Sequence, residues 1–133
     1  MLLLVPILGQ DQERHPAREI SAFRVTEPIR VDAILDETIW LVEGVTGFVQ
    51  RDPIEGNTPS QRTEVIVAYD HDALYVAARL YDTAPDSITR RLARRDESPT
   101  ADKFSVEIDP WLDHRTGFFF VVNAAGAIRD GTL

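Results

Sequence analysis

The stretch from Arg62 to Asp82, RTEVIVAYDHDALYVAARLYD, constrains the fold of this chain more than any other. Two runs of β-branched, aromatic and other apolar residues flank Asp70-His71-Asp72. A short Asp-rich turn between two such runs is typical of a β-hairpin. Because both faces of each run carry apolar residues, we expect the hairpin to lie inside a sheet that is covered on at least one side.

The rest of the chain predicts further strands and turns, and no long helix. Pro28 limits the first apolar run to an edge strand or to two short pieces. Asp36 and Asp86 are each expected to cap a short helical turn. Turn signals recur about every ten residues, the spacing of an antiparallel β-sandwich. Besides the hairpin, strands are expected at residues 20–31, 45–50, 104–109 and 118–123.

The alternation of apolar and polar residues along these strands predicts which side chains form one sandwich interior. Phe104 and its apolar neighbours are expected to point inward, while Ser105 and Glu107 point outward. Trp40 lies between apolar residues and is expected to close the end of the core, with a sugar-stacking role as the alternative. The residues expected to be buried are Val65, Val67, Leu74, Val76, Phe104, Val106, Ile108 and Phe120.

Composition excludes several classes of function. The chain has 133 residues and a net charge of −8, so it lacks the surplus of basic residues that nucleic-acid binding requires. The absence of cysteine excludes disulfides, thiolate zinc sites and cysteine nucleophiles. With 44% hydrophobic and 27% charged residues, the sequence is typical of a globular domain.

The two ends of the sequence carry separate expectations. MLLLVPIL is too short to span a bilayer and resembles the apolar core of a secretory signal, although it lacks a basic start and a clear cleavage site. We therefore expect residues 1–18 to be a signal remnant and disordered lead-in of an exported, periplasmic or outer-membrane-associated protein; a frayed N-terminus is the alternative. The last run stops at Leu133 without a closing strand, which predicts that residues 19–133 form the N-terminal part of a larger domain.

No common catalytic or nucleotide-binding motif occurs in the sequence. Glu64, Glu107 and Asp109 were candidates for a pair of catalytic carboxylates, but outward carboxylates on strands are ordinary surface residues. The turns at 70–72 and 109–113 could hold a structural calcium ion, although they lack the ligand spacing of an EF-hand. The sequence thus predicts a protein that is not an enzyme and carries no cofactor beyond such an ion.

Several motifs together resemble family 9 carbohydrate-binding modules, in particular those at the N-terminus of bacterial proteins with a large outer-membrane barrel-like region. Ala33 stands where that family commonly has glycine. The resemblance covers roughly Ile29 to the end and implies a β-sandwich that binds a polysaccharide or oligosaccharide, without catalysis, in polysaccharide breakdown. It also implies a parent protein with a C-terminal barrel or a glycoside hydrolase domain. The motifs are V-D-A-I-L-D-E-x-x-W, R-T-E-V-x-V-x-Y-D-x-D-A-L-Y-V, R-R-D-E, D-K-F-x-V-x-I-D and D-x-R-T-G-F-x-F-x-V-N-x-x-G.

The sugar site of that family matches this sequence poorly. Pro99, Ser105 and Val121 stand where the resemblance implies a tryptophan, a glutamate and an arginine. A sugar site is still expected on the outward face of the strand at 104–109 and in its neighbouring turns. It would combine an aromatic stacking surface with hydrogen-bond acceptors and the planar hydrogen-bond donors of arginine. The alternatives are a self-paired charged surface and an exported structural or interaction domain that has lost sugar binding. The candidate contacts are Glu107, Trp111, Arg91, Arg95 and Asn123.

Overall fold

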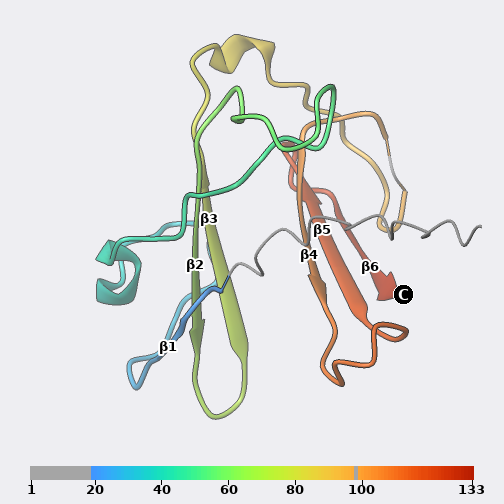
Figure 1. Ribbon diagram of the computed structural model, residues 1–133. Coiled ribbons are helices and arrows are strands. Elements are labelled where there is room, and N and C mark those ends of the chain that lie inside the picture. Colours follow the sequence, from blue (N-terminus) through green and yellow to red (C-terminus); the bar gives the residue numbers. More distant parts are fainter. Residues whose placement is uncertain (1–18, 98) are drawn as a thin grey trace, which may run out of the picture. The chain divides into compact units, whose positions relative to one another are not determined.

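The computed structural model describes residues 19–97 and 99–133 of the chain. These residues form two three-stranded sheets and two short 3-10 helices (Figure 1). The predicted all-β class is confirmed, and the presence of two sheets agrees with the predicted β-sandwich. The predicted signal remnant at residues 1–18 lies outside the described residues. The elements are β1 (Ala22–Arg24), η1 (Thr38–Leu41), β2 (Thr63–Tyr69), β3 (Leu74–Leu80), η2 (Pro85–Ser87), β4 (Lys103–Ile108), β5 (Phe118–Asn123) and β6 (Ile128–Thr132).

The first sheet has the order β1-β2-β3 and contains the predicted hairpin, with β2 antiparallel to β3. Asp70 closes the hairpin turn, because its carboxylate accepts the N–H groups of Asp72 at 2.7 Å and Ala73 at 2.8 Å. The short strand β1 pairs with β2 in parallel, with Ala22 opposite Val67. This parallel edge is a departure from the antiparallel pairing expected throughout.

The core of the first sheet lies on one face of β2. Trp40 on η1 is 3% exposed and packs against Ile66, Ala68 and Ala77, so the prediction that this tryptophan is a core residue is confirmed. Ile66 is 2% exposed, and it lies on the same face of the strand as Glu64 and Ala68. The face that the sequence analysis favoured is the opposite one.

Several of the expected core positions are therefore wrong. Val65 is buried, but Val67 and Val76 are only partly buried, and Leu74 at the hairpin end is 51% exposed. Alternation could not choose between two apolar faces of β2, and Trp40 packs on the face that carries Ile66. Phe120 on β5 is also largely exposed, at 49%.

The second sheet has the order β4-β5-β6, and both pairings are antiparallel. The alternation predicted for β4 is confirmed, since Phe104, Val106 and Ile108 are partly buried while Ser105 and Glu107 are exposed. Residues 128–132 form the strand β6 at one edge of this sheet. The expectation that residues 19–133 are the N-terminal part of a larger domain stays a prediction.

The two predicted helical turns are 3-10 helices, and the residues that precede them differ from the expected capping residues. Glu37, not Asp36, precedes η1, and its side chain makes no capping bond to that helix; instead its carboxylate accepts the N–H of Arg30 at 2.8 Å. Ala84 precedes η2, which contains Asp86. The strand expected at 45–50 is reduced to one bridge, from Val45 to Val65.

Ala33 adopts an unusual backbone conformation, with a φ of 65°. This value lies in the left-handed region, where a side chain costs energy and glycine does not. The neighbouring Asp32 carboxylate accepts the N–H of Ile34 at 2.9 Å and holds the turn in place. The conformation explains why glycine would be favoured at this position of the motif.

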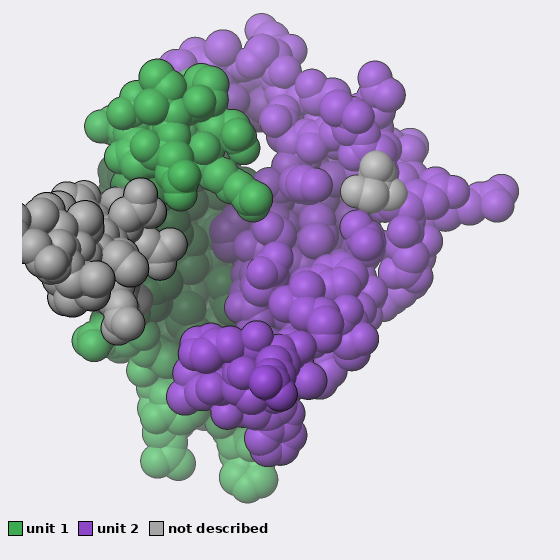
Figure 2. Space-filling model, turned by 45° about the vertical axis from the view of Figure 1, so that its right-hand side comes forward, with its two compact units in different colours: residues 1–81 green, residues 82–133 purple. Residues whose placement is uncertain are grey.

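The chain divides into two compact units, Met1–Tyr81 and Asp82–Leu133 (Figure 2). Each unit contains one of the two sheets. Within the described part of the chain, no helix is long and apolar enough to cross a membrane. The assignment of residues 19–133 to one domain stays a prediction.

Candidate functional site

The outward face of the second sheet gathers aromatic, cationic and acidic side chains. On β4 this face carries the exposed residues Lys103, Ser105 and Glu107. The register places Phe119 beside Glu107 and Val121 beside Ser105 on the central strand β5. It then places Arg129 and Gly131 on β6, opposite Val121 and Phe119 respectively. Residues directly opposite in a sheet share a face, so these side chains form one surface.

Phe119 lies across the neighbouring strand β6. A Cβ atom added to Gly131 would come within 2.8 Å of both Cε1 and Cζ of the Phe119 ring. Glycine is required there because the ring occupies the space that a side chain would fill. The guanidinium carbon of Arg129 is 5.0 Å from the ring centroid, a cation–π distance. The aromatic ring is thus held in position by the strand pairing.

This surface is hollowed in two adjoining places within the second unit. The larger hollow has a volume of about 280 Å³. The smaller has a volume of about 20 Å³ and is lined in part by Glu97, Pro99 and Asn123. Lys103, Val121 and Arg129 line both hollows, so the two are neighbours. The residues that line the larger hollow are Lys103, Ser105, Glu107, Phe119, Val121, Arg129 and Leu133.

The charged side chains of this surface, Lys103, Arg129 and Glu107, form no ion pairs in the described part of the chain. Among residues 19–97 and 99–133, the ion pairs involve other side chains, and neither Lys103 nor Arg129 meets a carboxylate. Glu107 likewise has no cationic partner in that part of the chain. A lysine offers three donors, an arginine a planar fork of donors, and a glutamate two acceptor oxygens. The surface can therefore bind a ligand that has an apolar face and a polar rim.

Of the predicted contacts, Glu107 lines the larger hollow and Asn123 the smaller one. The side-chain amide of Asn123 is largely occupied by hydrogen bonds within the chain. Its side-chain amide donates to the carbonyl oxygen of Arg91 at 2.8 Å, and its Oδ1 accepts the N–H groups of Ala125 and Ala127 at 2.9 Å. It holds the turn between β5 and β6, and it brings the Arg91 backbone to this turn.

The remaining predicted contacts line neither hollow. The side chain of Arg95 pairs with Asp130 on β6, while Arg91 is exposed. Trp111 lies in the loop between β4 and β5 and is 76% exposed. Of the two arginines predicted as sugar contacts, Arg95 thus forms an ion pair and Arg91 lies on the surface.

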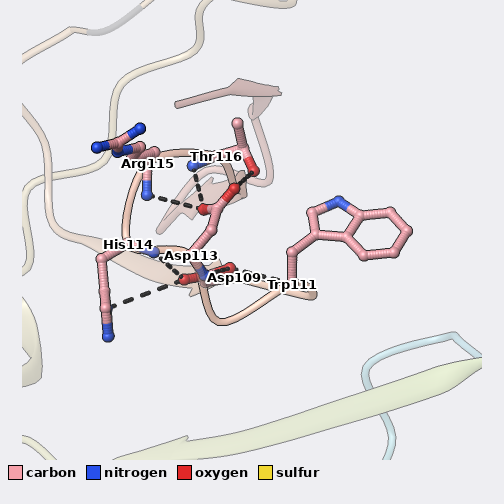
Figure 3. Close-up of polar contacts among 6 residues, drawn as sticks. All are labelled: Asp109, Trp111, Asp113, His114, Arg115 and Thr116. Carbon is pink, nitrogen blue, oxygen red and sulfur yellow. Dashed lines mark hydrogen bonds and ion pairs between the residues drawn. The ribbon is translucent and has the colours of Figure 1, made fainter.

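The loop that carries Trp111 is built around two aspartates (Figure 3). Asp109 accepts the N–H groups of His114 at 2.9 Å, Trp111 at 3.1 Å and Asp113 at 3.4 Å. These bonds, that of His114 above all, lower the pKa of Asp109. The Trp111 indole points away from both carboxylates, so the loop presents it to solvent.

Asp113, the second aspartate of this loop, accepts the N–H groups of Thr116 and Arg115, each at 2.8 Å. It also accepts the Thr116 hydroxyl at 2.7 Å, and these bonds lower the pKa of Asp113. The oxygens of both aspartates are engaged by the loop itself. In the described ranges, no three acidic, histidine or cysteine side chains are gathered as a metal site would need. The hypothesis of structural calcium gains no support from this loop.

Glu64 was expected on the surface, but it is buried in the first unit, at 7% exposure. Its carboxylate accepts the N–H of Gly44 at 3.0 Å and the hydroxyl of Tyr81 at 3.1 Å. Arg62 and Arg79 approach it at 3.5 and 4.0 Å. The Gly44 N–H, the Tyr81 hydroxyl and the two arginines lower the pKa of Glu64 against the opposing effect of burial. This cluster satisfies a buried charge and offers no catalytic partner carboxylate.

Sequence reasoning missed Phe119, Lys103 and Arg129 as site residues. The run from Phe118 to Val122 is apolar on both faces, so nothing in it showed which phenylalanine shares a face with Glu107. The signal in the sequence is Gly131, which follows the apolar Ile128 by three residues. A glycine within a strand indicates the close approach of another group, here the Phe119 ring.

Comparisons of the chain with protein-family models, curated proteins and solved structures found no match. The resemblance to family 9 carbohydrate-binding modules therefore stays a prediction from the motifs.

Proposed function

We propose that this chain is a non-catalytic carbohydrate-binding module and that its glycan lies on the outward face of β4, β5 and β6. The observation that carries the proposal is the larger hollow, where the Phe119 ring lies among Lys103, Arg129 and Glu107. Ligand sites combine an apolar or aromatic surface with a few polar groups that fix orientation.

The chemistry of a sugar ring matches this set of side chains. The C–H face of a pyranose packs on an aromatic ring, and its hydroxyls need both donors and acceptors. Phe119 supplies the ring, Glu107 the acceptors, and Lys103 with Arg129 the donors. The exposed indole of Trp111 offers a further stacking surface on its own loop.

The module acts, in this proposal, as an accessory to polysaccharide breakdown by a parent or partner protein. The parent carries a glycoside hydrolase domain or an outer-membrane barrel and is exported to the periplasm or outer membrane. These statements rest on the sequence motifs alone. The proposed glycan site on β4, β5 and β6 does not depend on the nature of the parent protein.

An exported interaction domain without sugar binding is the second candidate. It is favoured by the apolar face of the second sheet, which lies opposite the proposed site. Phe118, Phe120, Val122 and Ile128 on that face are 42–49% exposed. Apolar side chains gathered on one exposed face often mark a surface that contacts another protein.

Titration calorimetry with xylan, cellulose and mixed oligosaccharides tests the first proposal. Phe119→Ala should abolish binding, because it removes the stacking surface. Phe118→Ala is the matched control, since Phe118 is adjacent on the same strand and points to the opposite face. Gly131→Ala should also weaken binding, because its new methyl group must displace the Phe119 ring.

Trp111→Ala separates a contribution of the loop from that of the sheet face. Binding that survives Phe119→Ala and disappears in Trp111→Ala would move the site to the loop. The absence of heat with any glycan would leave the interaction domain as the better account. Circular dichroism of each variant checks that the fold is retained.

A further inference from the structure

The proposed glycan site carries two cations that pair with no carboxylate in the described part of the chain. Lys103 and Arg129 line both hollows, and neither forms an ion pair there. The chain as a whole has a net charge of −8, with 22 acidic and 14 basic residues. What sets these two apart is that they line the same hollows, so both are available to one negative group of a ligand.

The register places Arg129 opposite Val121 on one side of β5, and Lys103 opposite Asn123, two residues further along, on the other side. Lys103 begins β4 and Arg129 lies on β6, with β5 between them. Strands two positions apart are about 10 Å from each other, a separation that two long side chains can bridge around one small group. The floor between them is the apolar Val121 side chain, which lines both hollows.

The two acidic residues of the surface lie on different sides of the cations. Glu107 lines only the larger hollow and Glu97 only the smaller one, whereas Lys103 and Arg129 line both. Along β4, Glu107 is separated from Lys103 by about 13 Å. The order acid, cations, acid favours a single negative group with neutral groups at both ends, and it repels a ligand that is charged along its whole length.

We propose that the site binds an acidic glycan and that the carboxylate of one uronic acid unit lies between Lys103 and Arg129, flanked by neutral sugar units. This inference rests on the proposed function of the same surface. The planar guanidinium of Arg129 matches a carboxylate in shape and hydrogen-bonding pattern, and its contact with the Phe119 ring holds it in position. Lys103 contributes a second positive charge from the opposite side.

The test compares two ligands that differ only in charge. One is a xylo-oligosaccharide with a single glucuronic acid branch, and the other is the same compound after reduction of its carboxyl group to an alcohol. Calorimetry at low salt should show the acidic compound binding more tightly, and the difference should shrink as salt is added. Polygalacturonate, which is charged on every unit, should bind more weakly than the sparsely charged compound.

Arg129→Gln and Lys103→Gln should each weaken binding of the acidic compound by up to about fivefold, the range of a partly exposed ion pair. Each should weaken binding of the reduced compound by less, because glutamine keeps a hydrogen-bond donor for a sugar hydroxyl and loses only the positive charge. Arg90→Gln is the matched control, because it changes the net charge equally at an exposed position that lines neither hollow. A loss in Arg90→Gln equal to that in Arg129→Gln would overturn the inference.

Equal affinity for the acidic and the reduced compound would also overturn it, while the proposal of carbohydrate binding would stand. Binding of neither compound, nor of any other glycan, would instead remove the proposed function itself. Urea unfolding of each variant shows whether a loss of binding has its origin in stability.

Discussion

The substitution Ile66→Ala tests which face of β2 forms the core of the first unit. Ile66 is 2% exposed and packs with Trp40, Ala68 and Ala77. Its neighbour Val67 points to the opposite face and is only partly buried. Val67→Ala is therefore a matched control, one residue away in the same strand.

The expected loss of stability follows from the groups that each substitution removes. Ile66→Ala deletes about three methylene equivalents at about 0.8 kcal/mol each, which gives about 2.4 kcal/mol from transfer alone. The cavity left beneath the rigid indole of Trp40 adds to this loss, so we expect about 3 kcal/mol in total. Val67→Ala deletes about two equivalents at a partly exposed position and should cost about 1 kcal/mol or less.

Urea unfolding followed by tryptophan fluorescence measures both values. Trp40 is 3% exposed and Trp111 is 76% exposed, so a Trp111→Phe background leaves a signal that reports on the first unit alone. The transition midpoint should fall strongly in Ile66→Ala at an unchanged slope. A change in slope would show that the substitution altered the unfolded ensemble and not the core alone.

The result that would refute this reasoning is a larger loss in Val67→Ala than in Ile66→Ala. The main core would then lie on the face of β2 that carries Val65 and Val67, the face expected from the sequence. Trp40 would in that case have to pack elsewhere, and its fluorescence would respond to Val67→Ala instead.

Two further predictions concern single residues of the first unit. The pKa of Glu64 is lowered from its usual 4.5, so the stability that it contributes is complete above about pH 4.5 and is lost as the pH falls through its folded-state pKa; in Glu64→Gln, acid titration of unfolding should lose this part of the dependence. Ala33 has a φ of 65°, so Ala33→Gly should stabilise the protein by about 0.5–1 kcal/mol in the same urea assay, and a loss of stability would contradict the strained conformation.

Strands β4 and β5 and the hairpin could be predicted because their signals are local. The limits of β5 coincide with those of the predicted strand, five apolar residues from Phe118 to Val122 followed by Asn123. The hairpin turn is specified by Asp70, whose side chain satisfies the backbone of the turn. Such features depend on neighbouring residues, so a single sequence contains the information.

The choice of core face could not be predicted, because it depends on a contact between segments that are distant in sequence. Both faces of β2 carry apolar residues, and one of them also carries Glu64. A carboxylate on a strand argues for a solvent face unless partners remove its charge penalty. Those partners are Gly44, Tyr81 and two arginines, and none of them is marked as such by its place in the sequence.

The candidate site shows the same division between local and distant information. Glu107 was predicted because alternation along its own strand points it outward. Phe119 gains its role only from Gly131, which is brought opposite by the register of β5 and β6. That register depends on Asn123, whose Oδ1 accepts the N–H groups of the turn between the strands. A slip by one residue would carry the side chains of β6, Arg129 among them, to the other face of the sheet. The sequence predicted Asn123 as a direct sugar contact. Its observed hydrogen bonds give it another role: it fixes the strand pairing that brings Phe119 and Arg129 together.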